Sequence, residues 1–333
     1  MALMELKFYA QTLGMCTSCY VILPQRSHGV GVDGSNVTAD RYPVLYLLHG
    51  ASDDHTIWLR RTNIERYVSA MGWAVVMPEV LLSRYENMAH GPRYQDFIVD
   101  ELPQVVERFF PISGKREDKA ICGLSMGGWG ALKAGLMFPD KYAHVGILSS
   151  GNLLYRTDGV RGPASSRGEG RYPLSMAIYN TMDQASLRDS LWDPYTHALT
   201  NLKEGKIMPR FFHAIGVDDF LYEPSWKTKE WFEAHPEISY EYHEGPGAHT
   251  WDFWDQWIQV FLKFMVDQDT TIPGEKEAIA AHQAELAAKA EEAAPEDTAA
   301  LAAKEKELQE SKERDRENRL RRIHGRVIPG QKH

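Results

Sequence analysis

Ser125, which has a glycine two positions before it and another two positions after it, is the residue whose neighbours most directly indicate a catalytic role. Ser125 stands at the centre of GLSMG (123–127), which follows KAIC (119–122) of an expected strand and precedes a helix-forming segment. A nucleophile on a tight strand-to-helix turn needs residues without side chains two positions before and after it, because a Cβ atom there would meet the neighbouring strand and helix. The pattern predicts that Ser125 is a nucleophile and that the Met126 N–H, at the helix N-terminus, binds an oxyanion.

A serine hydroxyl is a weak nucleophile until a base takes its proton, so the hypothesis requires a histidine later in the chain. His249 lies in the loop EGPGAHTW (244–251), between the last expected strand and the last expected helix. His213 and His243 lie inside expected strands and are interpreted as core or sheet-face residues. The sequence therefore predicts that His249 is the base.

The base must in turn be oriented by a carboxylate, which should precede it in the chain. Asp218 and Asp219 follow the expected strand 210–216 directly, and only one of the two can face an imidazole. The loop must first leave the strand, which favours Asp219 and keeps Asp218 as the alternative.

The second oxyanion donor is expected in the loop after the strand 42–48. The His49-Gly50 pair lets the main chain approach a site closely, and the Ala51 N–H is the best candidate donor. We interpret His49 as a hydrogen-bonded support, and residues 53–55 (DDH) as a turn and helix cap. No metal site is predicted, because these residues lack a second ligand group at a recognised spacing. Cys16 and Cys19 likewise lack a second cysteine pair.

Short apolar runs alternate with amphipathic ones, which predicts an α/β fold with a doubly wound, mostly parallel sheet. Two early runs, 7–13 and 18–23, should pair as an antiparallel edge. Residues 151–206 fit no strand pattern and are predicted to form a lid-like insertion over the carboxyl edge of the sheet. Strands are expected at 42–48, 73–77, 119–124, 145–149, 210–216 and 238–243, and helices at 56–71, 96–110, 128–138, 224–235 and 250–266.

Composition limits the class of protein, the partners and the cellular location that can be expected. The chain has 333 residues, 43% hydrophobic and 25% charged, which is typical of a folded globular protein. Its formal net charge of -9 argues against nucleic acid as a partner. The absence of a long apolar run argues against a membrane span or a signal peptide, and three cysteines suit a reducing compartment, so a cytoplasmic location is expected.

The composition changes near residue 268. Residues 1–267 hold all nine tryptophans, whereas 268–333 consist mainly of Ala, Glu, Lys and Arg, which are strong helix formers. We expect a globular domain over 1–267 and a helical extension over 268–333. Its apolar heptad positions are not sustained, which favours solvated helices over a dimerisation or docking arm, although a homo-oligomer stays possible.

Several linked motifs resemble the esterase D group, which includes tributyrin esterases, S-formylglutathione hydrolases and feruloyl or acetylxylan esterases. The resemblance covers residues 1–267. The motifs are LGMCTSCYVILP (13–24), YPVLYLLHGASDDHTIWLRRTNIERY (42–67), VVMPE (75–79), DELPQVVERFFP (100–111), ICGLSMGGWGALKAGLMFPDKY (121–142), GVDDFLY (216–222) and EGPGAHTWDFWDQWI (244–258).

The resemblance implies an α/β-hydrolase fold, hydrolysis of short acyl esters and neither metal nor cofactor. It assigns the nucleophile to Ser125, the acid to Asp219 and the base to His249. It also assigns the oxyanion donors to Ala51 and Met126, and it places Trp58 near the acyl pocket. The segment 49–67 differs from the SGLTCTEQNF-like text of S-formylglutathione hydrolases, which favours the tributyrin-esterase branch.

The expected function is that of a serine carboxylesterase acting on short-chain acyl esters. The alternatives are a feruloyl or acetylxylan esterase acting on plant polysaccharide fragments, an S-formylglutathione hydrolase, or an acyltransferase using the same acyl-enzyme. A scaffold whose extension is the working interaction module is a further alternative, against which the complete Ser, His and Asp set argues.

Overall fold

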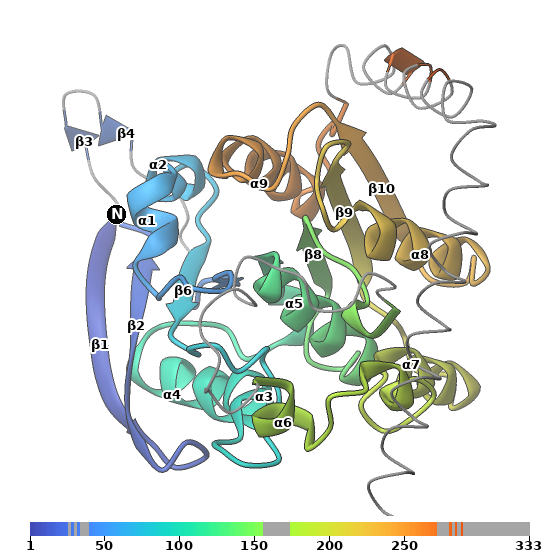
Figure 1. Ribbon diagram of the computed structural model, residues 1–333. Coiled ribbons are helices and arrows are strands. Elements are labelled where there is room, and N and C mark those ends of the chain that lie inside the picture. The colour runs from blue at the N-terminus through green and yellow to red at the C-terminus, as the bar shows by residue number, and fades with distance from the viewer. Residues whose placement is uncertain are drawn as a thin grey trace, which may run out of the picture. The chain divides into compact units, whose positions relative to one another are not determined.

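The computed structural model describes residues 1–25, 28–29, 32–33, 40–155 and 174–271, together with 280, 281, 284 and 288. The chain divides into two units, Met1–Glu275 and Lys276–His333, and the first of them is described below (Figure 1). Almost all of the predicted extension, 268–333, lies outside the described residues, as does the segment 156–173 of the predicted insertion.

An eight-stranded sheet forms the centre of the first unit. Its strands follow the order β1-β2-β6-β5-β7-β8-β9-β10. The β1–β2 and β2–β6 pairs are antiparallel and every other pair is parallel. The predicted parallel sheet with an antiparallel edge is therefore confirmed, but the first edge strand spans 2–10 rather than the expected 7–13, because residues 11–14 form the turn. The bounds are β1 (Ala2–Ala10), β2 (Met15–Leu23), β5 (Val44–Leu48), β6 (Ala74–Pro78), β7 (Lys119–Leu124), β8 (His144–Leu148), β9 (Arg210–Gly216) and β10 (Tyr240–Gly245), with a separate hairpin of β3 (His28–Gly29) and β4 (Val32–Asp33).

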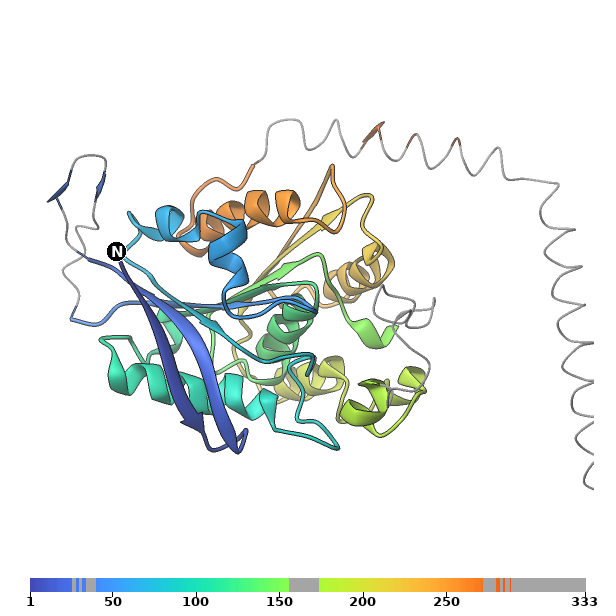
Figure 2. The same ribbon diagram turned by 60° about the vertical axis from the view of Figure 1, so that its left-hand side comes forward.

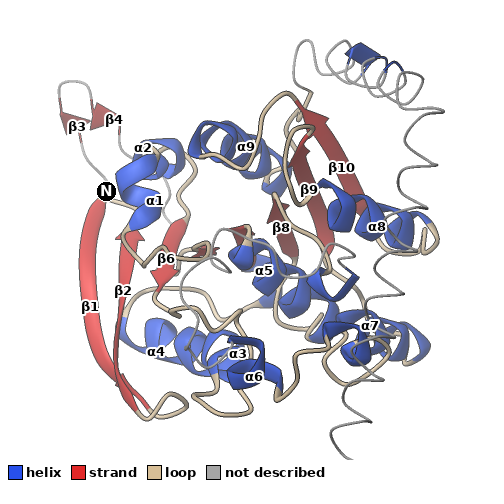
Figure 3. Ribbon diagram, in the orientation of Figure 1, coloured by secondary structure: helices blue, strands red, loops and turns tan. Residues whose placement is uncertain are grey.

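The helices lie in two layers, one on each face of the sheet (Figures 2 and 3). Successive residues of a strand face opposite sides, so Tyr46 of β5 packs in one core and Leu45 and Leu47 pack in the other. The core of Leu45 and Leu47 is covered by α1 (Ile57–Arg61), α2 (Ile64–Val68) and α9 (Trp251–Met265). The core of Tyr46 is covered by α3 (Tyr94–Asp96), α4 (Leu102–Phe109), α5 (Met126–Met137), α6 (Leu174–Tyr179), α7 (Pro194–Lys203) and α8 (Tyr222–Glu233).

The prediction of a single helix at 56–71 is wrong, because two separate helices, α1 and α2, occupy this segment. Thr62 is extended, with φ -134° and ψ 172°. Its hydroxyl donates to the Trp58 carbonyl and accepts from the Ile64 N–H, at 2.6 and 3.2 Å. The Thr62 hydroxyl thus accepts from the Ile64 N–H, which in a continuous helix would donate to the Arg60 carbonyl.

The helix expected at 96–110 begins two residues earlier, at Tyr94, and contains a π-helical segment, η1 (Phe97–Glu101). Leu102 N–H bonds to the Phe97 carbonyl, five residues back. Pro103 follows at once and has no N–H to donate. The π-helical segment therefore lies just before the proline, which cannot donate the backbone hydrogen bond of a regular α-helix.

The predicted insertion lies between β8 and β9. Its described part contains α6, α7 and the short turns η3 (Leu153–Tyr155) and η4 (Gln184–Leu187), and α7 packs on α5. Asp193 caps α7 by accepting from the Tyr195 N–H and also accepts from the Asn152 amide, at 3.1 and 3.0 Å. The contact between Asn152 and Asp193 joins the beginning of the insertion to its last helix, and its role as a lid stays a prediction.

Within the part of the chain that the structure describes, no helix is both long enough and apolar enough to cross a membrane.

Candidate active site

Ser125 occupies the turn between β7 and α5. Its backbone has φ 53° and ψ -118°, a left-handed φ that residues with side chains seldom adopt. Two backbone hydrogen bonds hold it, because the Ser125 N–H donates to the Leu148 carbonyl and its own carbonyl accepts from the Trp129 N–H, at 2.8 and 3.0 Å. The strained turn presents the hydroxyl at the carboxyl edge of the sheet, in front of the α5 N-terminus.

The glycines on either side of Ser125 are required by close backbone contacts. A Cβ atom on Gly123 would overlap the Gly127 backbone, and one on Gly127 would lie 2.5 Å from the Leu48 carbonyl oxygen. Neither contact can be relieved by rotating a side chain. The structure therefore gives the physical reason for the glycine spacing noted in the sequence.

The loops after β9 and β10 bring an acid and a base to this serine. The His249 Nε2 atom lies 2.9 Å from the Ser125 Oγ atom. The His249 Nδ1 atom lies 3.0 and 2.9 Å from the two carboxylate oxygens of Asp219. Since Asp219 accepts from Nδ1–H, Nε2 is left to accept the serine proton. The three predicted residues thus form one continuous path of hydrogen bonds.

Asp219, rather than Asp218, contacts the imidazole. The Asp219 side chain is fully buried and also accepts from the Leu221 N–H at 2.8 Å. Asp218 is exposed, and its N–H donates to the Gly247 carbonyl at 3.0 Å. This backbone bond joins the two loops and turns the Asp218 side chain outward, while the next residue faces His249.

The loop after β5, residues 49–55, is named the oxyanion loop here because it carries the predicted donor Ala51. A Cβ atom on Gly50 would lie 3.7 Å from the Ser125 Cβ atom, so the main chain of the loop passes beside the nucleophile. Met126 is the first residue of α5, and the first N–H groups of a helix have no partner within it. Both predicted oxyanion donors therefore lie on backbone next to Ser125.

Charged groups border the oxyanion loop. Burial raises the pKa of Asp53, against the opposing effects of His49 and of the hydrogen bond that its carboxylate accepts from the Gly50 N–H. The His49 ring is fully buried, and its Nδ1 atom lies 2.8 Å from the Gly50 carbonyl oxygen. The predicted supporting role of His49 agrees with this contact.

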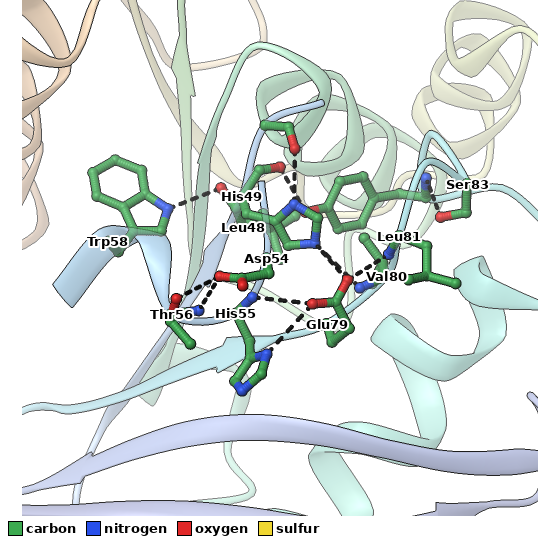
Figure 4. A network of polar contacts seen from close by, with 12 residues as sticks. Leu48, His49, Asp54, His55, Thr56, Trp58, Glu79, Val80, Leu81 and Ser83 are labelled. Carbon is green, nitrogen blue, oxygen red and sulfur yellow. Dashed lines mark hydrogen bonds and ion pairs between the residues drawn. The ribbon is translucent and has the colours of Figure 1, made fainter. Parts of the chain in front are cut away.

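Trp58 lies behind the oxyanion loop rather than in the open. Its side chain is 1% exposed and its indole N–H donates to the Leu48 carbonyl at 3.0 Å (Figure 4). Its ring meets the Trp251 ring edge-on at 5.2 Å between centroids. These contacts fasten the end of β5 to the start of α9, and contact of Trp58 with an acyl group stays a prediction.

No group of three His, Cys, Asp or Glu side chains among the described residues is arranged to hold a metal ion. Asp54 accepts from the Thr56 N–H at 2.9 Å, so the DDH segment forms the expected turn, but the N-cap of α1 is Thr56 and not a residue of this segment. His55 faces Glu79, with 3.4 Å between Nδ1 and Oε2. Cys16 is exposed and Cys19 is buried, and neither forms a disulfide.

Phe220 and Glu79 are two further residues at the site that were not predicted from the sequence. The Phe220 ring lies 4.3 Å from the His249 ring, centroid to centroid, and the residue is 49% exposed. Glu79 ends the VVMPE motif and contacts the oxyanion loop. Both follow strands at the carboxyl edge of the sheet, which is the signal by which they could have been found.

Residues 11–265 match the family described as "Putative esterase". An acetyl esterase of Caldicellulosiruptor saccharolyticus is 31% identical over 273 residues, which cover 80% of this chain and 98% of the relative. Two solved structures from Staphylococcus aureus, an S-formylglutathione hydrolase (FrmB) and the fluorophosphonate-binding serine hydrolase FphF, are 33% and 32% identical. Each covers 80% of this chain and 98% of its own, with TM-scores of 0.66 and 0.67. By family match, coverage and fold, this chain belongs to the esterase family of α/β-hydrolases, as the resemblance to the esterase D group predicts, and is a serine esterase.

Proposed function

We propose that this chain hydrolyses esters of short acyl groups through an acyl-enzyme on Ser125. The observation that carries the proposal is the continuous path of hydrogen bonds from the Ser125 hydroxyl through His249 to the buried Asp219. A nucleophile, a base and an orienting acid in this order are the parts that acyl transfer to serine requires.

In the first step the Ser125 Oγ atom attacks the carbonyl carbon of the ester while its proton passes to His249 Nε2. The carbonyl oxygen becomes an oxyanion, to which the N–H groups of Ala51 and Met126 donate. The C–O bond to the alcohol then breaks and the leaving oxygen takes the proton from Nε2. Asp219 stabilises the imidazolium that exists between the two transfers.

In the second step water attacks the acyl carbon of the Ser125 ester. His249 accepts a proton from that water and returns it to the Ser125 Oγ atom as the acyl–oxygen bond breaks. The carboxylic acid leaves and the free hydroxyl is restored. These steps use only groups of this chain and water.

The name of the Caldicellulosiruptor relative supports the assignment of a short acyl group, since that protein is an acetyl esterase. The Staphylococcus relative FrmB supports the alternative of S-formylglutathione hydrolysis. A feruloyl or acetylxylan ester is the other alternative: a xylanase/feruloyl esterase of Xylanibacter ruminicola is 27% identical over 161 residues, which cover 22% of that protein. An acyltransferase would form the same acyl-enzyme and pass the acyl group to another acceptor.

The match to the esterase family supports a small-molecule ester as the partner. The net charge of -9 disfavours a nucleic-acid ligand, and we keep the cytoplasmic location and a homo-oligomer as proposals.

A panel of substrates under one set of conditions tests the proposal. It contains p-nitrophenyl esters of rising chain length, tributyrin, methyl ferulate, acetylated xylo-oligosaccharide and S-formylglutathione. We expect the highest kcat/KM for acetyl and butyryl esters. A far higher value for S-formylglutathione, for the ferulate or for the acetylated sugar would replace the short-chain assignment with that alternative, and no turnover of any ester would contradict the proposal.

A further inference from the structure

A half-buried acidic residue, Glu79, connects the oxyanion loop with the next loop of the sheet edge (Figure 4). Glu79 follows β6 directly, and β6 pairs in parallel with β5, which ends at the oxyanion loop. The two loops therefore leave the same edge side by side. The Glu79 N–H donates to the Ser18 carbonyl of β2 at 3.1 Å, which fixes the start of its loop to a third strand.

Each carboxylate oxygen of Glu79 contacts a different partner set. Oε1 accepts from the Leu81 N–H at 2.7 Å and lies 3.5 Å from the His49 Nε2 atom. Oε2 accepts from the His55 N–H at 3.2 Å and lies 3.4 Å from the His55 Nδ1 atom. One side chain thus bonds both its own loop and the two ends of the oxyanion loop.

These contacts keep Glu79 ionised. Burial alone would raise the pKa of its carboxyl, but hydrogen bonding and charge attraction from His49, with the Leu81 N–H, lower that pKa to about 2. Hydrogen bonds to an ionised acceptor are stronger than those between neutral groups. The carboxylate therefore also stabilises Leu81, whose φ of 53° is left-handed.

The His49 ring connects Glu79 with the peptide that carries the predicted oxyanion donor, Ala51. The His49 Nδ1–H donates to the Gly50 carbonyl at 2.8 Å, and on the other side of the ring Nε2 lies 3.5 Å from Glu79 Oε1 and 3.2 Å from the Val80 nitrogen. In a trans peptide the N–H points opposite to the carbonyl. Fixing the Gly50 carbonyl against His49 therefore aims the Ala51 N–H away from that ring.

The Gly50 main chain is also the part of this loop that lies beside Ser125. The Tyr85 hydroxyl donates to the His49 carbonyl at 2.8 Å. The segment 79–85 therefore contacts His49 at its ring and at its backbone, and holds the peptide that follows it.

We propose that Glu79 is a positioning residue of this esterase, whose carboxylate holds the oxyanion loop so that the Ala51 N–H faces the oxyanion formed at Ser125. The proposal rests on the proposed function. Glu79 touches neither Ser125 nor His249 in any contact recorded for the described residues, so its effect passes through His49 and the loop backbone.

The variant Glu79→Gln tests this proposal with little change in volume. A glutamine has one acceptor oxygen, which cannot serve the Leu81 N–H and the His55 N–H together. Removing one oxyanion donor typically costs about 10²–10³ in kcat, and we expect misplacement to cost about 10- to 100-fold. KM should stay within about threefold, because the interaction is made in the transition state.

Glu5→Gln is the matched control. Glu5 of β1 approaches the same His55 from the other side, with 3.8 Å between Oε1 and Nε2, and its side chain is 42% exposed. Its carboxylate pairs with Lys7 and His55 and forms no hydrogen bond or ion pair with His49 or Leu81. We expect kcat of Glu5→Gln to equal that of the wild type.

Two measurements separate positioning from loss of folded protein. The p-nitrophenol burst counts the competent sites, so kcat is expressed per active site. The inhibition constant of a trifluoromethyl ketone, which forms an oxyanion on the serine, should rise by the same factor by which kcat/KM falls. If Glu79→Gln does not fold, Glu79→Asp, which keeps the charge but is one methylene shorter, is expected to show the same parallel loss.

Unchanged kcat per active site, a loss confined to KM, or an unchanged ketone inhibition constant would overturn the positioning role. Wild type and Ser125→Ala are measured beside the variants. If these two hydrolyse esters equally, the proposed function itself fails, and that result is distinct from any result with Glu79→Gln.

Discussion

The His249 Nε2 atom lies 2.9 Å from the Ser125 Oγ atom, although 124 residues separate them in the chain. Ser125 follows β7 and His249 follows β10, two strands that are parallel members of one sheet with β8 and β9 between them. The carboxyl ends of parallel strands meet at one edge, and ligand sites in such sheets form there. Topology therefore accounts for the meeting of residues so distant in sequence.

Asp219→Asn should lower kcat by about 10⁴-fold or somewhat less, because an amide cannot hold His249 in the tautomer that accepts the serine proton. Asp218→Asn is the matched control: it changes the adjacent, exposed residue, and its effect should stay within about twofold. Ester hydrolysis at saturating substrate gives both values. Equal losses in the two variants would contradict the assignment of Asp219.

Gly123→Ala should destabilise the protein by about 1–3 kcal/mol, the range for forcing an added methyl group into a packed site. The new Cβ atom would meet the Gly127 backbone, which cannot move without displacing α5. Gly114→Ala is the control, since its nearest neighbour is the Glu107 carboxylate at 3.0 Å, the end of a flexible side chain. Urea unfolding measures both, and similar stabilities would argue against the steric explanation.

Phe220→Ala should impair aromatic esters more than aliphatic ones. The Phe220 ring lies against His249 and is half exposed, so it offers a face to an aromatic group bound at the site. An aromatic pair contributes about 0.5–1.5 kcal/mol, which corresponds to a rise of about 2- to 10-fold in KM for methyl ferulate. Phe109→Ala, which removes an exposed ring at the end of α4, is the control. A parallel change for ethyl acetate would exclude this specificity role.

His213 makes the fold less stable in acid. It is fully buried in β9, its Nε2–H donates to the Ser150 carbonyl at 2.7 Å, and its Nδ1 accepts from the Tyr240 hydroxyl at 2.8 Å. Burial lowers the pKa of His213 to about 3, although the bond to Ser150 opposes the shift. The unfolded chain, with an imidazole pKa of about 6.5, therefore takes up a proton that the fold excludes.

Stability should accordingly fall as the pH drops from about 6.5 towards 3, by up to about 1.4 kcal/mol per pH unit from this residue. His213→Gln should be less stable near neutral pH but show a shallower decline, whereas His90→Gln at the exposed His90 should keep the wild-type slope. Urea unfolding at several pH values provides the test. An unchanged slope in His213→Gln would contradict it.

The sequence was sufficient to predict the residues whose placement depends on local structure. Ser125 was predictable because a strand, a glycine-flanked turn and a helix are contiguous in the chain. Asp219 and His249 were predictable because each follows a strand that ends at the same sheet edge.

The details that sequence reasoning missed depend on contacts between distant segments or on single side chains. At the break between α1 and α2 the Thr62 hydroxyl, in place of a backbone carbonyl, accepts from the Ile64 N–H. The contact of Glu79 with His55 and His49 exists only because the β5–β6 pairing brings two loops together. Neither effect has a periodic signature in the sequence.

The central claim is that Ser125 forms an acyl-enzyme. The most direct test is mass spectrometry of the protein quenched in acid during turnover of p-nitrophenyl acetate, followed by peptide mapping. We predict an added acetyl group on the peptide that contains Ser125. We further predict that Ser125→Ala shows neither this adduct nor hydrolysis while it keeps the wild-type Tm. An acetyl group on another residue, or wild-type turnover by Ser125→Ala, would contradict the claim.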